Sequence, residues 1–388
     1  MVFSSMLFLW IFLPLVLVAY YVSPQKFRNG ILIFFSLLFY AWGEPVYIFL
    51  MLFSVLLNFA GGIFIEKYPG KKKLILCGIV GINLLLLGYF KYFNFFSFSQ
   101  VALPIGISFY TFQALSYVID VYRGEVKAQH NFSHMLLYIS FFPQLIAGPI
   151  VKYKEIENQI RNRKETLEKF SYGILRFVRG LGKKVLLANA FAKVVDEIFK
   201  YGPDVASRKT LWLGAVLYML QIYYDFSGYS DMAIGLGKMF GFDFSENFRH
   251  PYIATSVQDF WRRWHISLSS WFRDYVYIPL GGNRKGTFCT YRNLLIVFFL
   301  TGIWHGAGLA FIVWGLYYGV FLILERVWLG ERLKKCCPFA GWVYTMAVVF
   351  LGWILFRAEN LPLFFAYVKN MFVEHGGTLL ISAYLDRK

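Results

Sequence analysis

Charged residues are scarce in this 388-residue chain. Asp, Glu, Lys and Arg together make up 16% of it, whereas hydrophobic residues make up 58%. A soluble domain is usually about a quarter charged and about half apolar or less. The low charge therefore excludes an ordinary soluble protein and predicts a chain that lipid surrounds over most of its length.

Acidic residues are fewer than basic ones, 22 against 39, which leaves a formal net charge of +17. The basic residues gather in loops between apolar runs, as they do in the cytoplasmic loops of membrane proteins. We therefore expect them to face anionic membrane lipids, and we expect no nucleic-acid partner.

Cysteine is also rare. The four cysteines form neither a disulfide framework nor a metal-binding spacing, so we expect no metal site and no bound cofactor. Cys336 and Cys337 are adjacent, and the sequence leaves open whether they are free thiols at a helix end or acylated at the membrane edge. The sequence has no phosphate loop and no G-x-S-x-G elbow, so phosphoryl transfer and serine hydrolysis lack their signatures.

The first apolar run, 3–22, has no basic segment before it and no small-residue cleavage site after it. Its positive charges, Lys26 and Arg28, come after the run. The pattern predicts a retained first span with the N-terminus outside the cytoplasm.

Further apolar runs of about bilayer length follow along the chain. The predicted spans are 3–22, 30–42, 46–65, 74–96, 104–122, 291–304, 308–328, 339–357 and 361–383. Over the first five spans, basic loops fall on every second connection, which indicates alternating crossings.

The alternation breaks at 133–150, which is apolar but is followed by a strongly basic segment. If 133–150 crossed the membrane, that charge would lie outside. Pro143 and Pro149 favour instead a broken, re-entrant helix that returns to the cytoplasmic side. The non-helical backbone of such a helix is either buried in protein or lines a wet cavity. Residues 166–200 combine apolar and basic positions at helical spacing, which predicts a helix in the membrane interface.

The segment 103–124 carries the first group of polar residues within an apolar run. Gln113, Ser116 and Asp120 recur at helical spacing and share one face. In a membrane such a face points into the protein, either to line a site or to bond neighbouring helices.

A second group lies in 223–244, where Asp225 and Asp231 sit in apolar surroundings. A buried carboxylate is costly unless it is paired. We predict structural pairing rather than catalysis, with Arg262 or Arg263 as the partner.

A third group, 259–286, contains WRRWH and GGNRKG. If the helix continues through WRRWH, Trp261 and His265 lie one turn apart on a shared face. The arginines of this segment suit headgroups or a phosphorylated ligand.

GGNRKG, 281–286, has exposed amides and two basic side chains. It is either a plain turn or an anion-binding nest in which Asn283, Arg284 and Lys285 hold phosphate.

The fourth group is a single histidine, His305, within NLLIVFFLTGIWHGAG. Such a ring must be solvated, hydrogen-bonded or used. Gly302, Gly306 and Gly308 make the neighbouring positions small, which predicts room for a ligand beside Trp304.

These groups together resemble the membrane-bound O-acyltransferase (MBOAT) family, and within it the alginate O-acetylation (AlgI-like) branch. The resembling blocks, in order between about 101 and 328, are LPIGISFYTFQALSYVIDVYRG, FFPQLIAGPI, YYDFSGYSDMAIGLGKMFGF, ENFRHPYI, FWRRWHISLSSWFRDYVYIPLGGNRKG and GIWHGA. The N-terminal spans resemble the family in character only.

The resemblance implies an all-α membrane protein with a ring of helices, broken and interfacial helices among them, around a central tunnel. It implies that His305 is the catalytic histidine and that His265 is a second, more variable polar residue. Beside these two histidines, we expect Trp304, Tyr223, Tyr224, Asp225, Arg262 and Arg263 to orient the donor or acceptor.

The resemblance also implies the reaction. An acetyl group from cytoplasmic acetyl-CoA would pass across the bacterial cytoplasmic membrane to an extracytoplasmic polysaccharide, with an SGNH-type acetyltransferase as partner. D-alanyl transfer to teichoic acid, as in the DltB-like branch, stays open, as do a transporter or flippase and a non-catalytic scaffold. The DltB-like branch usually lacks an obvious PLGGNRKG.

We expect one membrane domain over 1–388. Its parts are N-terminal spans (1–122), a re-entrant and amphipathic region (123–210), a catalytic core (211–328) and C-terminal spans (329–388). Relatives in this branch usually continue through further spans, so we expect the chain to be a shortened form.

Overall fold

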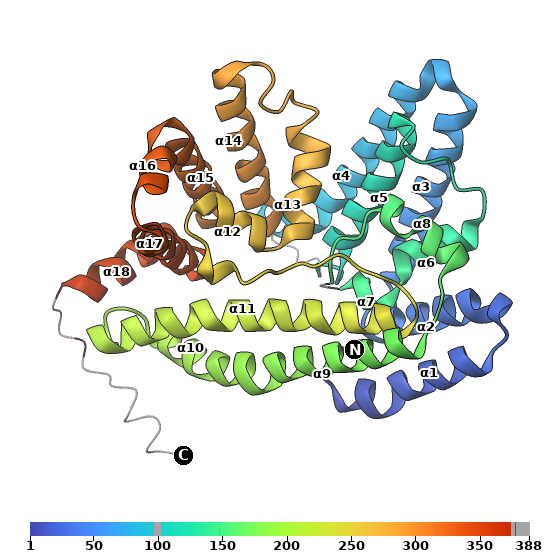
Figure 1. The fold of residues 1–388 in the computed structure, drawn as a ribbon, viewed down its shortest axis with the longest axis horizontal. Coiled ribbons are helices and arrows are strands. Elements are labelled where there is room, and N and C mark those ends of the chain that lie inside the picture. The colour runs from blue at the N-terminus through green and yellow to red at the C-terminus, as the bar shows by residue number, and fades with distance from the viewer. Residues whose placement is uncertain (97–101, 147, 374–376, 378–388) are drawn as a thin grey trace. The chain divides into compact units, whose positions relative to one another are not determined.

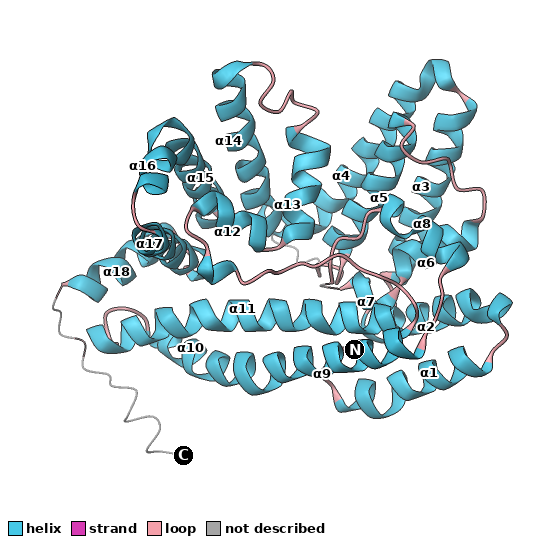
Figure 2. Ribbon diagram, viewed as in Figure 1, coloured by secondary structure: helices cyan, strands magenta, loops and turns pink. Residues whose placement is uncertain are grey.

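The computed structural model describes residues 1–96, 102–146, 148–373 and 377. Every regular element in these ranges is a helix, as Figure 2 shows, which confirms the predicted all-α class. The chain forms two compact units, one of residues 1–181 and 229–246 and one of residues 182–228 and 247–388. The predicted single membrane domain and its parts stay a prediction.

The first unit begins at the N-terminus, and its residues 1–181 are coloured blue to green in Figure 1. Its helices are η1 (Phe8–Phe12), α1 (Leu13–Val22), η2 (Gln25–Phe27), α2 (Arg28–Gly43), α3 (Ile48–Lys67), η3 (Pro69–Lys71), α4 (Lys72–Phe96), α5 (Ile107–Arg123), α6 (Phe132–Ser140), α7 (Phe142–Leu145), α8 (Tyr153–Asn162) and α9 (Leu167–Gly182). Helices α3, α4 and α5 pack side by side.

Helix α11 (Arg208–Met239) contributes its last residues to the first unit and the rest to the second. The other helices of the second unit are η4 (Lys183–Ala188), α10 (Asn189–Tyr201), η5 (Pro251–Ile253), α12 (Val257–Arg263), α13 (Ile266–Phe272), η6 (Arg273–Tyr277), α14 (Gly286–His305), α15 (Leu309–Leu324), η7 (Glu325–Leu329), α16 (Gly330–Lys335), α17 (Pro338–Arg357) and α18 (Leu361–Phe372).

Five helical stretches among the described residues are long and apolar enough to cross a membrane. They are Ile48–Lys67, Pro69–Phe93, Gly286–His305, Leu309–Leu333 and Pro338–Arg357. They match the predicted spans 46–65, 74–96, 291–304, 308–328 and 339–357. The predicted spans 3–22, 30–42 and 104–122 overlap the shorter helices α1, α2 and α5. Of the predicted span 361–383, only 361–373 and 377 lie within the described residues.

The predicted break within 133–150 is confirmed. Helix α6 ends at Ser140, and Phe141 leaves the helical conformation with ψ 111° before α7 begins. Pro143 lies in the first turn of α7, where its missing N–H removes no helical hydrogen bond. That the segment returns to the same side of the membrane stays a prediction, as does the interfacial position of 166–200.

Two glycines let α9 approach the end of α11 within the first unit. A Cβ added to Gly235 would lie 2.6 Å from the carbonyl oxygen of Gly173, so only glycine permits this crossing. Beside it, Arg176 donates to Asp231 at 2.7 Å and to Glu246 at 2.6 Å. The ion pairs compensate a mostly buried carboxylate and fix the helix crossing.

Candidate active site

His305 is the last residue of α14 and is half-buried. Its ring centroid lies 4.6 Å from that of Trp304, 4.9 Å from that of Trp314 and 5.0 Å from that of Phe356. All three rings stand nearly perpendicular to the imidazole. Helices α14, α15 and α17 thus supply an aromatic cage that fixes the orientation of this histidine.

Glycines set how closely α14 and α15 pack beside His305. A Cβ on Gly315 would lie 2.1 Å from the carbonyl oxygen of Phe298, and a Cβ on Gly302 would lie 2.4 Å from that of Phe311. The Phe311 ring also fills the space that a Cβ on Gly306 would need. The prediction that Gly302 and Gly306 leave room for a ligand was therefore wrong, because α15 occupies that room.

His265 lies in the turn between α12 and α13 and is almost fully buried. Its φ of 44° is left-handed, which is uncommon for a residue with a side chain. Two amides that follow it bond to Asn247: Ile266 N donates to the backbone oxygen at 2.9 Å, and Ser267 N donates to Oδ1 at 3.2 Å.

This turn corrects the prediction that Trp261 and His265 share one helical face. Helix α12 ends at Arg263, and the bonds to Asn247 reverse the backbone at His265 before α13 begins. Trp261 instead packs against Trp314 and Tyr318 of α15.

Only one of the two ring nitrogens of His265 has a hydrogen-bond partner among the described residues. Its Nδ1 lies 3.1 Å from Oδ1 of Asn247, whereas its Nε2 is buried and has no hydrogen-bond partner among the described residues. Burial lowers the pKa of the His265 imidazole to about 3, so the ring is neutral at physiological pH.

Trp304 contacts both histidines. Its ring centroid lies 6.1 Å from that of His265 and 4.6 Å from that of His305. The structure therefore brings together the two histidines and the tryptophan that the sequence indicated, all within the second unit.

Residues of α11 complete the surroundings of His265. Phe226 lies edge-on to the His265 ring at 4.6 Å. Tyr223 packs against Trp264 at 6.2 Å, while Tyr224 turns toward Phe191 of α10. Of the two tyrosines, only Tyr223 joins the aromatic cluster next to His265.

The carboxylates are paired, but not with the predicted arginines. Asp225 pairs with Lys184 at 2.8 Å, and Asp231 pairs with Arg176. The prediction of Arg262 or Arg263 as partner was wrong, because Arg263 bonds to Asp259 one turn earlier on α12. The side chain of Arg262 is exposed.

The GGNRKG turn leads into α14. Gly281, Gly282 and Gly286 all have positive φ, and the buried Asn293 donates to the Gly282 oxygen at 3.0 Å. Asn283, Arg284 and Lys285 are exposed just before the helix N-terminus. The geometry is compatible with anion binding, and phosphate binding stays a prediction.

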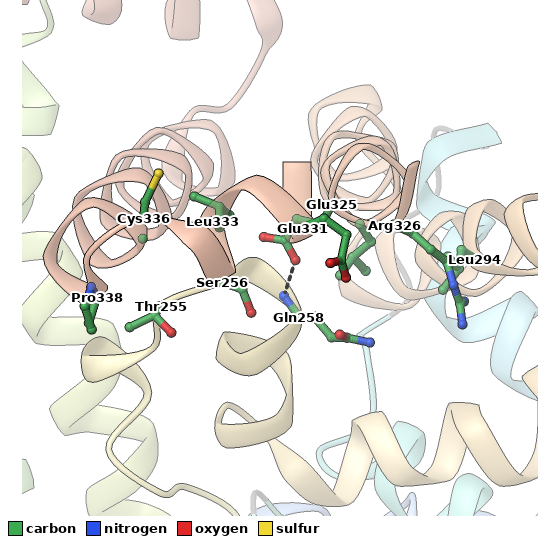
Figure 3. Close-up of a pocket in the computed structure, with 13 residues that line it drawn as sticks. Thr255, Ser256, Gln258, Leu294, Glu325, Arg326, Glu331, Leu333, Cys336 and Pro338 are labelled. Carbon is green, nitrogen blue, oxygen red and sulfur yellow. Dashed lines mark hydrogen bonds between the residues drawn. The ribbon is translucent and has the colours of Figure 1, made fainter. Parts of the chain in front are cut away.

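A separate cavity of about 450 Å³ lies between the start of α12, η7, α16 and the start of α17 (Figure 3). Glu325 on its wall accepts bonds from the amides of Val257 at 2.5 Å and Gln258 at 3.0 Å. Neither histidine lines this cavity. Glu325 therefore caps α12.

Comparison with known proteins shows to which family the chain belongs. Residues 38–368 match the model of the membrane-bound O-acyltransferase family, MBOAT. The chain belongs to this family. It is 46% identical over 383 residues to the probable alginate O-acetylase AlgI of Pseudomonas putida, a match that covers 93% of this chain and 78% of that protein.

Other relatives of this MBOAT protein carry related names. It is 34% identical over 432 residues to the peptidoglycan O-acetyltransferase of Helicobacter pylori, which covers 98% of this chain and 81% of that protein. It is 29% identical over 300 residues to the teichoic acid D-alanyltransferase of Bacillus subtilis, which covers 71% and 74%. The MBOAT protein is thus an enzyme, a membrane O-acyltransferase, and its O-acetylating relatives support O-acetyltransferase activity.

The sequence reading of this MBOAT enzyme missed Asn247, Phe226 and Phe311 as parts of the site. Phe226 and Asn247 lie inside the blocks YYDFSGYSD and ENFRHPYI, but no periodicity or charge distinguishes them there. Only the fold places them against His265 or beside His305. Among the described residues, no group of three His, Cys, Asp or Glu is placed to hold a metal ion.

Proposed function

We propose that this enzyme moves an acetyl group from cytoplasmic acetyl-CoA to hydroxyl groups of an extracytoplasmic polysaccharide, with an SGNH-type acetyltransferase completing the transfer. The observation that carries the proposal is the pair of histidines about Trp304, at the end of a membrane-length helix. The names of relatives that are 46% and 34% identical support acetyl as the group and a cell-envelope polymer as the acceptor.

In this proposal His305 is the general base. Its neutral imidazole takes the proton of the attacking hydroxyl, and the oxygen forms an ester bond with the acetyl carbon. The carbon–sulfur bond of the thioester breaks, and the proton passes to the departing thiolate. An imidazole, whose ordinary pKa is near 6.5, exchanges protons readily at physiological pH.

The surroundings of His305 favour this chemistry. The residue is half-buried, and the rings of Trp304, Trp314 and Phe356 pack around its imidazole and would limit the access of water. Excluding water limits thioester hydrolysis and strengthens polar contacts to the reacting groups.

The donor would enter from the cytoplasmic side. Basic loops mark that side of a membrane protein, and GGNRKG is one of them. Arg284 and Lys285 would meet the phosphates of acetyl-CoA beside the N-terminus of α14, with Asn283 next to them. We place the enzyme in a bacterial cytoplasmic membrane with its N-terminus outside, and lipid headgroups contact its basic loops.

D-alanyl transfer to teichoic acid is the second candidate. The 29% identity to a teichoic acid D-alanyltransferase favours it less than the higher identities favour acetyl transfer. The two reactions differ in the proteins that accompany the enzyme. Acetylation would need an SGNH-type transferase, whereas D-alanylation would need a carrier protein and an adenylating enzyme.

The experiment compares wild type, His305→Ala and His130→Ala at matched membrane levels. His130 is an exposed histidine paired with Glu66 in the other unit, which makes it the control. We expect O-acetyl esters on exported polysaccharide to disappear only with His305→Ala. Undiminished acetylation in that variant would contradict the proposal.

A further inference from the structure

The side chain of Asn247 bonds to three groups of one turn. Its Oδ1 lies 3.1 Å from Nδ1 of His265, 3.2 Å from the Ser267 amide and 2.9 Å from the Ser267 hydroxyl. Both Asn247 and His265 are buried. A fully buried carboxamide with three hydrogen bonds holds His265 and Ser267 in one arrangement.

The backbone amide of Ser267 shows which atom of the Asn247 carboxamide faces this turn. An N–H can only donate, so the Asn247 atom it meets is the carbonyl oxygen and not the amide nitrogen. That oxygen accepts, and the imidazole must therefore carry its proton on Nδ1. The unprotonated nitrogen of neutral His265 is Nε2.

Nε2 is left with an open lone pair in a buried position, since no described residue bonds to it. The rings that contact His265 are Phe226 of α11, edge-on at 4.6 Å, and Trp304 of α14 at 6.1 Å. Neither of these rings can gain or lose a proton at physiological pH. Trp304 also contacts His305, whose ring can.

We propose that Asn247 is a positioning residue for acyl transfer: it fixes the Nδ1–H tautomer of His265, so that Nε2 accepts a hydrogen bond from a second hydroxyl group of the acceptor, next to the attacking hydroxyl whose proton goes to His305. This inference rests on the proposed function. It adds a role that neither the sequence motifs nor the names of the relatives assign. Partners that orient a metal-bound histidine typically change activity by roughly 10- to 100-fold when removed, and we expect an effect of the same order for Asn247.

Three variants test the assignment in inside-out membrane vesicles given radiolabelled acetyl-CoA, with polymer-bound acetyl ester as the readout. Asn247→Ala removes the acceptor of the Nδ1 proton and should lower the rate roughly 10- to 100-fold. Asn370→Ala removes a different buried asparagine of the second unit, one that bonds to Pro203 and Asp204, and serves as the control, with a rate within about threefold of wild type. Protein amount and thermal midpoint in detergent are measured for each variant.

Asn247→Asp supplies a readout that a purely structural role would not move. The carboxylate still accepts the Nδ1 proton, so activity recovers at high pH, but it also favours the imidazolium and raises the pKa of His265. The acid side of the pH–rate profile should then move to higher pH by about one unit or more.

The outcomes separate this inference from the proposed function. If His305→Ala abolishes transfer while both Asn247 variants match wild type in rate and pH profile, the positioning role is wrong and the proposed function stands. If Asn247→Ala does not fold, the profile of Asn247→Asp still decides, because an unshifted acid side overturns the role. Full activity of His305→Ala contradicts the proposed function itself.

Discussion

The side-chain oxygen of Asn247 lies 3.1 Å from Nδ1 of His265, and the two residues are 18 positions apart in the chain. This contact ties the loop after α11 to the turn between α12 and α13. It also explains how a residue with a side chain keeps a φ of 44° at that turn. The neighbouring bonds to Ile266 and Ser267 offset the cost of the left-handed backbone.

The buried His265 predicts how stability depends on pH. Its folded pKa of about 3 lies below the ordinary value near 6.5, so between these values the unfolded chain binds a proton that the folded chain does not. This contribution to stability is present above pH 6.5 and is lost as pH falls toward 3. Between pH 7 and pH 5, wild type should lose about 2 kcal/mol more than His265→Gln.

Thermal unfolding in detergent at the two pH values, followed for both proteins, measures this difference. Equal losses in the two proteins would show that His265 is charged or solvated in the folded state.

Gly315→Ala tests the close packing of α14 and α15. Because the added methyl group would meet backbone at 2.1 Å, the helices must separate, and we expect a loss of about 1 to 3 kcal/mol. Gly88→Ala in α4 is the matched control, since nothing lies within 4 Å of its Cβ position. A lowered thermal midpoint is expected for Gly315→Ala alone, and equal midpoints would refute the packing argument.

Arg176→Ala tests the crossing of α9 and α11 in the first unit. It leaves the mostly buried Asp231 and its neighbour Glu246 without their cation, which should cost about 2 to 3 kcal/mol. Arg161→Ala removes an exposed pair with Glu157 and should cost less than about 1 kcal/mol. If both variants unfold at the same temperature, the Arg176 pairs do not fix the crossing.

Arg284→Ala combined with Lys285→Ala tests the donor site at GGNRKG. Losing two cations beside the α14 N-terminus should weaken binding of acetyl-CoA about tenfold or more, and the effect should shrink at high salt. Equilibrium binding to the purified protein gives the affinity. Arg332→Ala combined with Lys335→Ala removes two exposed cations of α16 and provides the charge-matched control. An affinity that equals wild type would leave GGNRKG as a plain turn.

Much of the fold followed from the sequence because hydrophobic length and loop charge are local signals. The five membrane-length helices, the break before Pro143 and the prominence of His305 are all of this kind. Buried carboxylates were expected to be paired for the same elementary reason.

The errors arose where a distant segment decides the local structure. Asn247 reverses the chain at His265, so the helix that WRRWH favours ends early. Lys184 and Arg176 lie 41 and 55 positions before their aspartates, whereas the predicted arginines were chosen from one neighbouring motif. Phe311 fills the space beside Gly306 because α15 folds back on α14, which glycine spacing alone does not reveal.

The central claim is that His305 is the base for transfer of acetyl from cytoplasmic acetyl-CoA to a polysaccharide on the far side of the membrane. Inside-out vesicles expose the cytoplasmic face, so radiolabelled acetyl-CoA is added outside and ester-bound label is measured on polymer inside. Wild type and His130→Ala should label the polymer equally, and His305→Ala should lower the initial rate at least about 100-fold. Undiminished labelling by His305→Ala would contradict the account.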